Sequence, residues 1–197
     1  VSIAPTVSIK PFAPKKRPRI VRSSVEPVRK VSASTSVADA DMAIEKVREY
    51  FRPFGMEDKI LEFEVSSATV ELAAQALHCE EQRIAKTMSF MVDDHAILIV
   101  TAGDAKVQNG KFKAEFSCKA KMLSFEEVEP LIGHAVGGVC PFGINEGVKV
   151  YLDESLKRFE TVFPACGSGN SAIELTIPQL EQYSNFEKWV DVCKLPE

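Results

Sequence analysis

The sequence predicts a mixed α/β domain over residues 39–197, preceded by a basic segment over residues 1–38. Short apolar runs typical of strands alternate with short amphipathic patterns typical of helices, and no internal repeat is present. Hydrophobic residues make up 45% of the chain and charged residues 26%, which is ordinary for a folded domain. The apolar run over residues 96–100 is far shorter than the ~20 residues that a membrane helix needs. We therefore expect no membrane partner.

The N-terminal segment differs in composition from everything that follows it. Residues 1–36 contain eight basic residues, one acidic residue and five prolines, whereas the rest of the chain contains 16 basic and 27 acidic residues. We expect this segment to be disordered. A serine-rich, acid-poor stretch with arginines is typical of an organellar transit peptide, and a solvated basic linker is the alternative. The expected location is the cytoplasm, or a plastid or mitochondrion if the segment is a transit peptide.

The first elements of the domain are a helix and a strand. Asp39 or Asp41 is available as the N-cap of the helix, and Pro53 and Gly55 are expected to end it. Residues 60–65 alternate between apolar and polar side chains, which predicts a strand.

A second helix and a β-hairpin are predicted next. Ser66 or Ser67 can cap the helix, and apolar runs over residues 88–92 and 96–100 flank an acidic turn at 93–94. The apolar stripe of this helix comprises Val70, Ala73, Ala74 and Leu77.

The last third of the chain predicts short elements. Asn109 and Gly110 interrupt the pattern, Ser124 starts a short helix, and Pro178 fits the first turn of a helix that runs to about Tyr183. The predicted strands are residues 148–152, 160–163, 172–175 and 189–193.

The cysteines give no sign of disulfides or of a metal site. They are five in number, without a CxxC pair, and His78 beside Cys79 is poor geometry for two ligands on one metal. We expect reduced thiols, no metal and no cofactor. The cysteines are Cys79, Cys118, Cys140, Cys166 and Cys193.

Two segments, residues 82–88 and 133–143, are candidates for chemistry. Lys86 precedes a nearly apolar run, so a partly desolvated ammonium there would bind a carbonyl, carboxylate or phosphate strongly; a lysine that reaches out to water is the alternative. The glycine-rich segment 133–143 can expose backbone N–H groups to an oxyanion or phosphate, or form a plain turn. It matches neither a P-loop nor a dinucleotide fingerprint. Residues 164–171 form a weaker third candidate, as a pocket lining or an ordinary loop.

In this order, the segments resemble the YbaK/prolyl-tRNA-editing family of aminoacyl-tRNA deacylases. The matching pieces are residues 73–77, 84–87, 133–143, 150–153, 155–156, 167 and 173–175. The resemblance implies a barrel-like mixed β-sheet flanked by short helices. It also implies hydrolysis of the ester in mischarged tRNA, with Cys- or Ala-tRNA(Pro) as substrates and prolyl-tRNA synthetase as a further partner. Position 140, often serine in such loops, is cysteine here.

The family's lysine falls on Lys86, which would be catalytic by holding the substrate carbonyl or a nearby phosphate. Loop N–H groups would then stabilise the oxyanion while water, or the thiol of a cysteinyl substrate, attacks. The expected substrate-binding residues are Thr87, His134, Gly137, Gly138, Cys140, Pro141, Phe142, Gly143, Asp153, Gly167, Ser168 and Asn170.

A local cluster of lysines suggests where tRNA would bind, although a solvated helix face explains it equally well. The cluster comprises Lys106, Lys111, Lys113, Lys119 and Lys121. Two rival functions also stay open. Cys140 near His134 could make a cysteine hydrolase if the two lie within hydrogen-bond reach. The domain could instead be a non-catalytic tRNA- or nucleotide-binding regulatory module.

Overall fold

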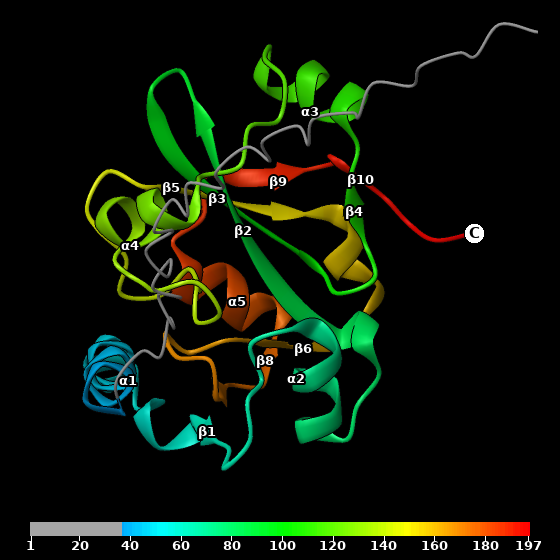
Figure 1. Cartoon of the computed structure of the whole chain (residues 1–197). Coiled ribbons are helices and arrows are strands. Elements are labelled where there is room, and N and C mark those ends of the chain that lie inside the picture. The colour runs from blue at the N-terminus through cyan, green and yellow to red at the C-terminus, as the bar shows by residue number, and fades with distance from the viewer. Residues whose placement is uncertain (1–36) are drawn as a thin grey trace, which may run out of the picture. The chain divides into compact units, whose positions relative to one another are not determined.

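The computed structural model describes residues 37–197, and the predicted segment 1–38 lies outside these residues apart from its last two (Figure 1). The domain is a mixed α/β fold with a curled six-stranded half-barrel, which confirms the predicted fold class. The helices are α1 (Val37–Phe51), α2 (Val70–Leu77), α3 (Asn109–Phe116), α4 (Phe125–Ile132) and α5 (Ile177–Ser184). Within residues 37–197, no helix has the length and apolar composition needed to cross a bilayer.

The six-stranded sheet has the order β8-β6-β2-β3-β5-β9. Its strands are β2 (Ile84–Val92), β3 (His95–Ala102), β5 (Lys149–Asp153), β6 (Thr161–Pro164), β8 (Leu175–Thr176) and β9 (Lys188–Val190). Two small antiparallel pairs join β1 (Leu61–Glu62) to β7 (Ser171–Ala172) and β4 (Lys106–Val107) to β10 (Cys193–Lys194).

The hairpin of β2 and β3 is the spine of the sheet and confirms the predicted hairpin. Asp93 and Asp94 form its two-residue turn with φ angles of 48° and 61°. Two consecutive positive φ angles suit the right-handed twist of a hairpin, and aspartate tolerates this region better than most residues. The strands pair from Val92 opposite His95 to Ala85 opposite Ala102.

Two predicted helix caps were wrong. Helix α1 begins at Val37, so Asp39 and Asp41 lie inside it. Helix α2 is capped by Thr69, whose hydroxyl accepts from the Leu72 N–H at 3.3 Å. Ser67 is not the cap because its own N–H donates to the Gly169 carbonyl at 2.6 Å, which holds it in the loop before the helix. Ser124 does cap α4, as predicted, in a capping box with Glu127.

Four other predicted boundaries changed. Residues 60–65 form only the two-residue strand β1, and Asn109–Gly110 open helix α3 instead of interrupting the chain. Residues 172–175 are divided between β7 and β8, and residues 189–193 between β9 and β10, because each of these strands pairs in a different sheet. The predicted helix at Pro178 is α5, and it ends at Ser184.

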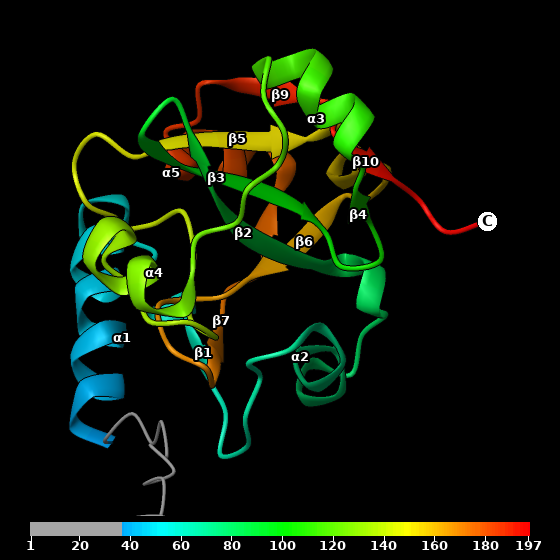
Figure 2. The same ribbon diagram turned by 45° about the horizontal axis from the view of Figure 1, so that its top comes forward.

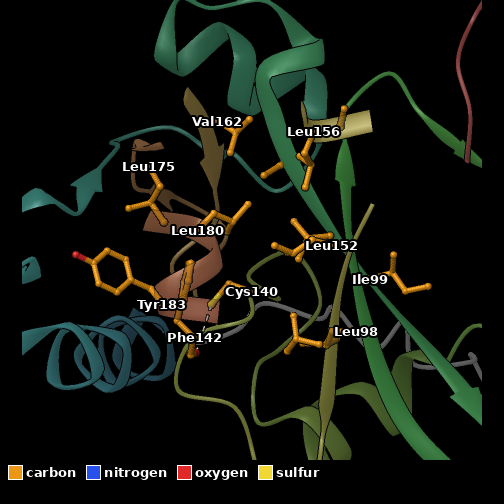
Figure 3. Packing of buried hydrophobic residues seen from close by; sticks show 14 of the residues in the cluster. Leu98, Ile99, Cys140, Phe142, Leu152, Leu156, Val162, Leu175, Leu180 and Tyr183 are labelled. Carbon is orange, nitrogen blue, oxygen red and sulfur yellow. Dashed lines mark hydrogen bonds between the residues drawn. The ribbon is translucent and has the colours of Figure 1, made fainter. Parts of the chain in front are cut away.

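The core fills the half-barrel and anchors the glycine-rich segment (Figure 3). Leu98 and Leu152 from the sheet, together with Leu180 from α5, are fully buried. Phe142 packs against Phe51 of α1 with the rings tilted by 54° and their centroids 4.7 Å apart. The segment that follows α4 is therefore pinned between α1 and the sheet.

Candidate active site

A cavity of about 320 Å³ lies against β2, with walls from α2, α4 and the segments that precede and follow them. Figure 2 shows α2 and α4 flanking the β2 strand. The lining of the cavity is mainly apolar, and Lys86 is the only ionisable residue among the described residues that line it. The lining includes Ser67, Thr69, Val70, Ala73, Lys86, Thr87, Met88, Ser89, Met122, Phe125, Val136, Gly137, Val139, Phe163 and Ser171.

The Lys86 side chain is half-buried and held by the turn that follows β3. Its Nζ donates to the Ala105 carbonyl at 2.6 Å and to the Gly103 carbonyl at 3.3 Å. An ammonium has three N–H donors, so with two acceptors among residues 37–197 one donor is left for a ligand. Burial lowers the pKa of Lys86, while nearby groups such as Asp104 and Glu71 oppose this shift. The ammonium is thus both fixed in place and partly stripped of water.

The glycine-rich segment reaches the same cavity through its first half. Val136, Gly137 and Val139 lie on the wall that Lys86 also lines. The Gly138 N–H donates to the Ala135 carbonyl at 3.1 Å, so this amide is already used. A Cβ at position 138 would stand 2.4 Å from the Gly167 carbonyl oxygen. Only glycine therefore lets these two predicted loops pack backbone against backbone.

The second half of the segment turns away from the cavity into the core. Cys140, Pro141 and Phe142 are buried and do not line the cavity. The His134 Nε2–H donates to the Phe142 carbonyl at 2.6 Å and lies 3.5 Å from the Cys140 sulfur. Burial raises the pKa of Cys140 to about 12 and lowers the pKa of His134. The two side chains are within reach of each other, but a neutral thiol and a neutral imidazole sealed from solvent do not support the cysteine-hydrolase hypothesis.

Five more predicted residues do not line the cavity and hold the surrounding loops in place. Asp153 is buried and accepts from the N–H groups of Ser155 and Val192, at 3.0 and 2.9 Å. Ser168 donates to Asn170 at 2.8 Å, and Asn170 in turn donates to the Phe63 carbonyl. Gly143 and Gly167 have φ angles of 61° and 89° and pack against α1. The loop of Ser168 reaches the cavity through Ser171, whose hydroxyl lies 2.6 Å from that of Ser168.

The predicted lysine cluster is exposed along β4, α3 and the connection from α3 to α4. Lys111 is the exception, because its Nζ donates to Asp191 at 2.7 Å and to the Cys193 carbonyl at 2.9 Å. Lys121 directly precedes Met122, which lines the cavity. The cluster therefore extends from α3 to the cavity rim.

Sequence reasoning missed two walls of the cavity. One is the segment 67–69 with Val70 and Ala73, which the helical pattern assigned only to packing. The other is Met122 and Phe125, which are 57% and 66% exposed although both are large and apolar. Phe125 is the first residue of α4, and its place in the sequence alone could not distinguish a core position from a cavity rim.

The fold is that of an editing domain, and the chain belongs to the aminoacyl-tRNA editing domain family, whose model matches residues 64–183. The chain is 53% identical over 154 residues to the uncharacterized protein YwhH of Bacillus subtilis, which covers 78% of this chain and 98% of that protein. It is 31% identical over 143 residues to the proline–tRNA ligase of Halalkalibacterium halodurans. That match covers 70% of this chain but only 24% of the ligase.

A solved structure shares this fold at a TM-score of 0.70 and 27% identity, covering 77% of this chain and 97% of the other. That protein is described as "a putative trans-editing enzyme for prolyl tRNA synthetase".

Proposed function

We propose that the protein is an aminoacyl-tRNA deacylase that hydrolyses the ester of mischarged tRNA in trans. The observation that carries the proposal is that Lys86 and Gly137 line one largely apolar cavity in an editing-domain fold. The reaction breaks the bond between the acyl carbon and the ribose oxygen. Water supplies the hydroxyl of the released amino acid, and the ribose oxygen takes up a proton.

In this mechanism Lys86 acts as a fixed positive charge. Two of its donors are held by Gly103 and Ala105, so the third is aimed without rotational freedom at the substrate carbonyl or a neighbouring phosphate. The Gly137 amide on the adjoining wall is the candidate oxyanion donor. Loss of one such donor costs about 10²–10³ in kcat in other enzymes. Because Lys86 is the only ionisable side chain that the described part of the chain contributes to the lining, water activation falls to the substrate itself or to solvent.

The expected substrates are tRNA(Pro) charged with cysteine or alanine. The similarity to proline–tRNA ligases supports this choice and makes prolyl-tRNA synthetase a candidate partner. The mainly apolar wall favours a small uncharged side chain. A site of this kind is useful because one methylene gives only ~1–3 kcal/mol of discrimination in a synthetase pocket.

A deacylation panel across charged tRNAs tests the proposal. Wild type should release the amino acid from at least one mischarged tRNA(Pro), and Lys86→Ala should lower kcat/KM by about 10²–10³-fold while its melting temperature stays close to that of wild type. Lys59→Ala is the matched control, since Lys59 is exposed and does not line the cavity. A folded and fully active Lys86→Ala protein would refute the role of Lys86.

A non-catalytic tRNA-binding module is the second candidate, and it is favoured because no described residue of the cavity wall has an acidic or histidine side chain. The same panel separates the two functions. Tight binding of charged tRNA(Pro) by wild type, without release of any amino acid, would establish the binding module.

A further inference from the structure

The outer edge of β2 is open where it borders the cavity. On one side β2 pairs with β3 from Ala85 to Val92, whereas on the other side β6 pairs only with Ile84 and Ala85. The next contact on that outer side is the Leu123 N–H, which donates to the Ser89 carbonyl at 3.1 Å. Between these two contacts the strand edge faces the cavity, and residues 86–89 all line it.

Alternation along the strand identifies the groups that face outward. In an antiparallel ladder, one residue directs both of its backbone polar groups to the partner strand and the next directs both away from it. The Ser89 carbonyl and the Met91 N–H both bond outward, to Leu123 and Lys121. Thr87 shares this parity, so its N–H and C=O point away from β3 into the opening. Its hydroxyl is also buried without a hydrogen-bond partner among the described residues.

An aminoacyl ester has the same polar groups as one residue of a β-strand: an amino donor and a carbonyl acceptor on either side of one Cα. We propose that the aminoacyl group of the substrate adds to the edge of β2 as a single strand residue opposite Thr87. Its amino group donates to the Thr87 carbonyl, and its ester carbonyl accepts from the Thr87 N–H. The pairing rests on the proposed function, because it takes the ligand to be an aminoacyl ester.

This pairing divides recognition between two parts of the cavity. The strand edge reads the main-chain atoms that all amino acids share, and the apolar wall of Val70, Ala73 and Phe163 is left to read the side chain. The pairing also places the scissile carbonyl next to Lys86, the preceding residue of the same strand. The enzyme should therefore require the α-amino group of its substrate, in addition to a side chain that fits.

A substrate comparison on the wild-type chain tests the requirement. Alanyl-tRNA(Pro) and propionyl-tRNA(Pro) differ only in the α-amino group, and lactyl-tRNA(Pro) replaces that group with a hydroxyl that keeps one donor. Each kcat/KM is divided by the uncatalysed hydrolysis rate of the same ester, because the amino group activates the ester by itself. The normalised value should fall at least tenfold for propionyl-tRNA(Pro) and recover in part for lactyl-tRNA(Pro).

The outcomes separate this pairing from the proposed function. Equal normalised rates for the alanyl and propionyl esters would overturn the pairing and leave the deacylase standing. A chain that hydrolyses none of the three esters, nor any other aminoacyl-tRNA, would overturn the deacylase and the pairing together.

Two variants test the protein side. Thr87→Pro removes the outward N–H together with the side-chain hydroxyl, and edge positions tolerate proline, so kcat/KM for alanyl-tRNA(Pro) should fall at least tenfold in a folded chain. Thr87→Val keeps that N–H and removes the hydroxyl, and it should lose less than threefold. Equal losses in both variants would assign the effect to the side chain and overturn the pairing. Should Thr87→Pro fail to fold, the propionyl comparison on wild type decides alone.

Discussion

Lys86 and Cys140 are the two side chains that the sequence marks most clearly for chemistry, and they lie in opposite environments. Lys86 lines a cavity and keeps one donor free, whereas Cys140 is fully buried beside His134, with a thiol pKa of about 12. One glycine-rich segment creates both environments. Its first half, at Val136 and Gly137, faces the cavity, and its second half, at Phe142, locks the segment into the core. The comparison shows that reactivity here depends on which side of the segment a residue occupies.

The largest expected effect comes from replacing Gly138, whose backbone packs against the loop of Gly167. Gly138→Ala would place a Cβ 2.4 Å from the Gly167 carbonyl oxygen, a backbone atom that cannot rotate away. We expect a loss of about 2–4 kcal/mol in the free energy of unfolding, measured by urea denaturation. The Gly137 wall should shift as well, so activity should fall in the fraction that still folds.

Gly110→Ala is the matched control for this prediction. Gly110 lies in α3 with open space around its Cβ position, so alanine there should stabilise the chain by about 0.5–1 kcal/mol. Equal stability of the two variants would show that the contact between the two loops is looser than the structure describes.

Thiol labelling measures the same contrast directly. Cys118 is partly exposed, whereas Cys140 and Cys166 are buried and burial raises the pKa of both thiols, so little reactive thiolate forms. Iodoacetamide at pH 8 should modify Cys118 at least a hundredfold faster than either buried thiol, as followed by peptide mass spectrometry. In guanidinium chloride all five cysteines should react. Native labelling of Cys140 at the rate of Cys118 would contradict the sealed environment.

The hairpin and helices α4 and α5 could be predicted because their signals are local. Two aspartates in a turn, a serine with a glutamate three residues later, and a proline in a first turn each act within a few residues. The failed boundaries depend on distant partners. Ser67 loses its capping role to a hydrogen bond with Gly169, about a hundred residues further along the chain. No local pattern contains that information.

The candidate site divides in the same way. The desolvation of Lys86 follows from the apolar run after it, but its two carbonyl partners at Gly103 and Ala105 come from the turn after the next strand. The burial of Cys140 could have been suspected from the Pro-Phe pair that follows it. The position of Phe125 on the cavity rim could not have been predicted. Only the tertiary fold decides whether the end of an amphipathic helix packs into the core or borders a cavity.

The exposed lysine cluster reaches the cavity rim, and we expect the tRNA backbone to bind along it. Replacing Lys106, Lys113 and Lys119 with glutamine should lower the slope of log K against log salt for tRNA binding by about 2, because each lost phosphate contact removes roughly 0.7–0.9. Affinity at moderate salt should fall about tenfold, as measured by fluorescence anisotropy. Lys111→Gln is the control. It should change the slope less, because Lys111 is already paired with Asp191. An unchanged slope in the triple variant would place the tRNA backbone elsewhere.

The smallest expected effect is that of replacing the buried Cys140. It decides between a mechanism centred on Lys86 and one with a cysteine nucleophile. Cys140→Ser puts a hydroxyl in a buried site that already offers the Phe142 carbonyl as an acceptor, 3.6 Å from the sulfur, so stability should fall by only about 1–2 kcal/mol. Because Cys140 does not line the cavity, kcat/KM should stay within threefold of wild type. Cys166→Ser is the matched control, since that thiol is equally buried. A hundredfold loss in Cys140→Ser alone, at unchanged stability, would restore the thiol as a nucleophile and remove Lys86 from the centre of the mechanism.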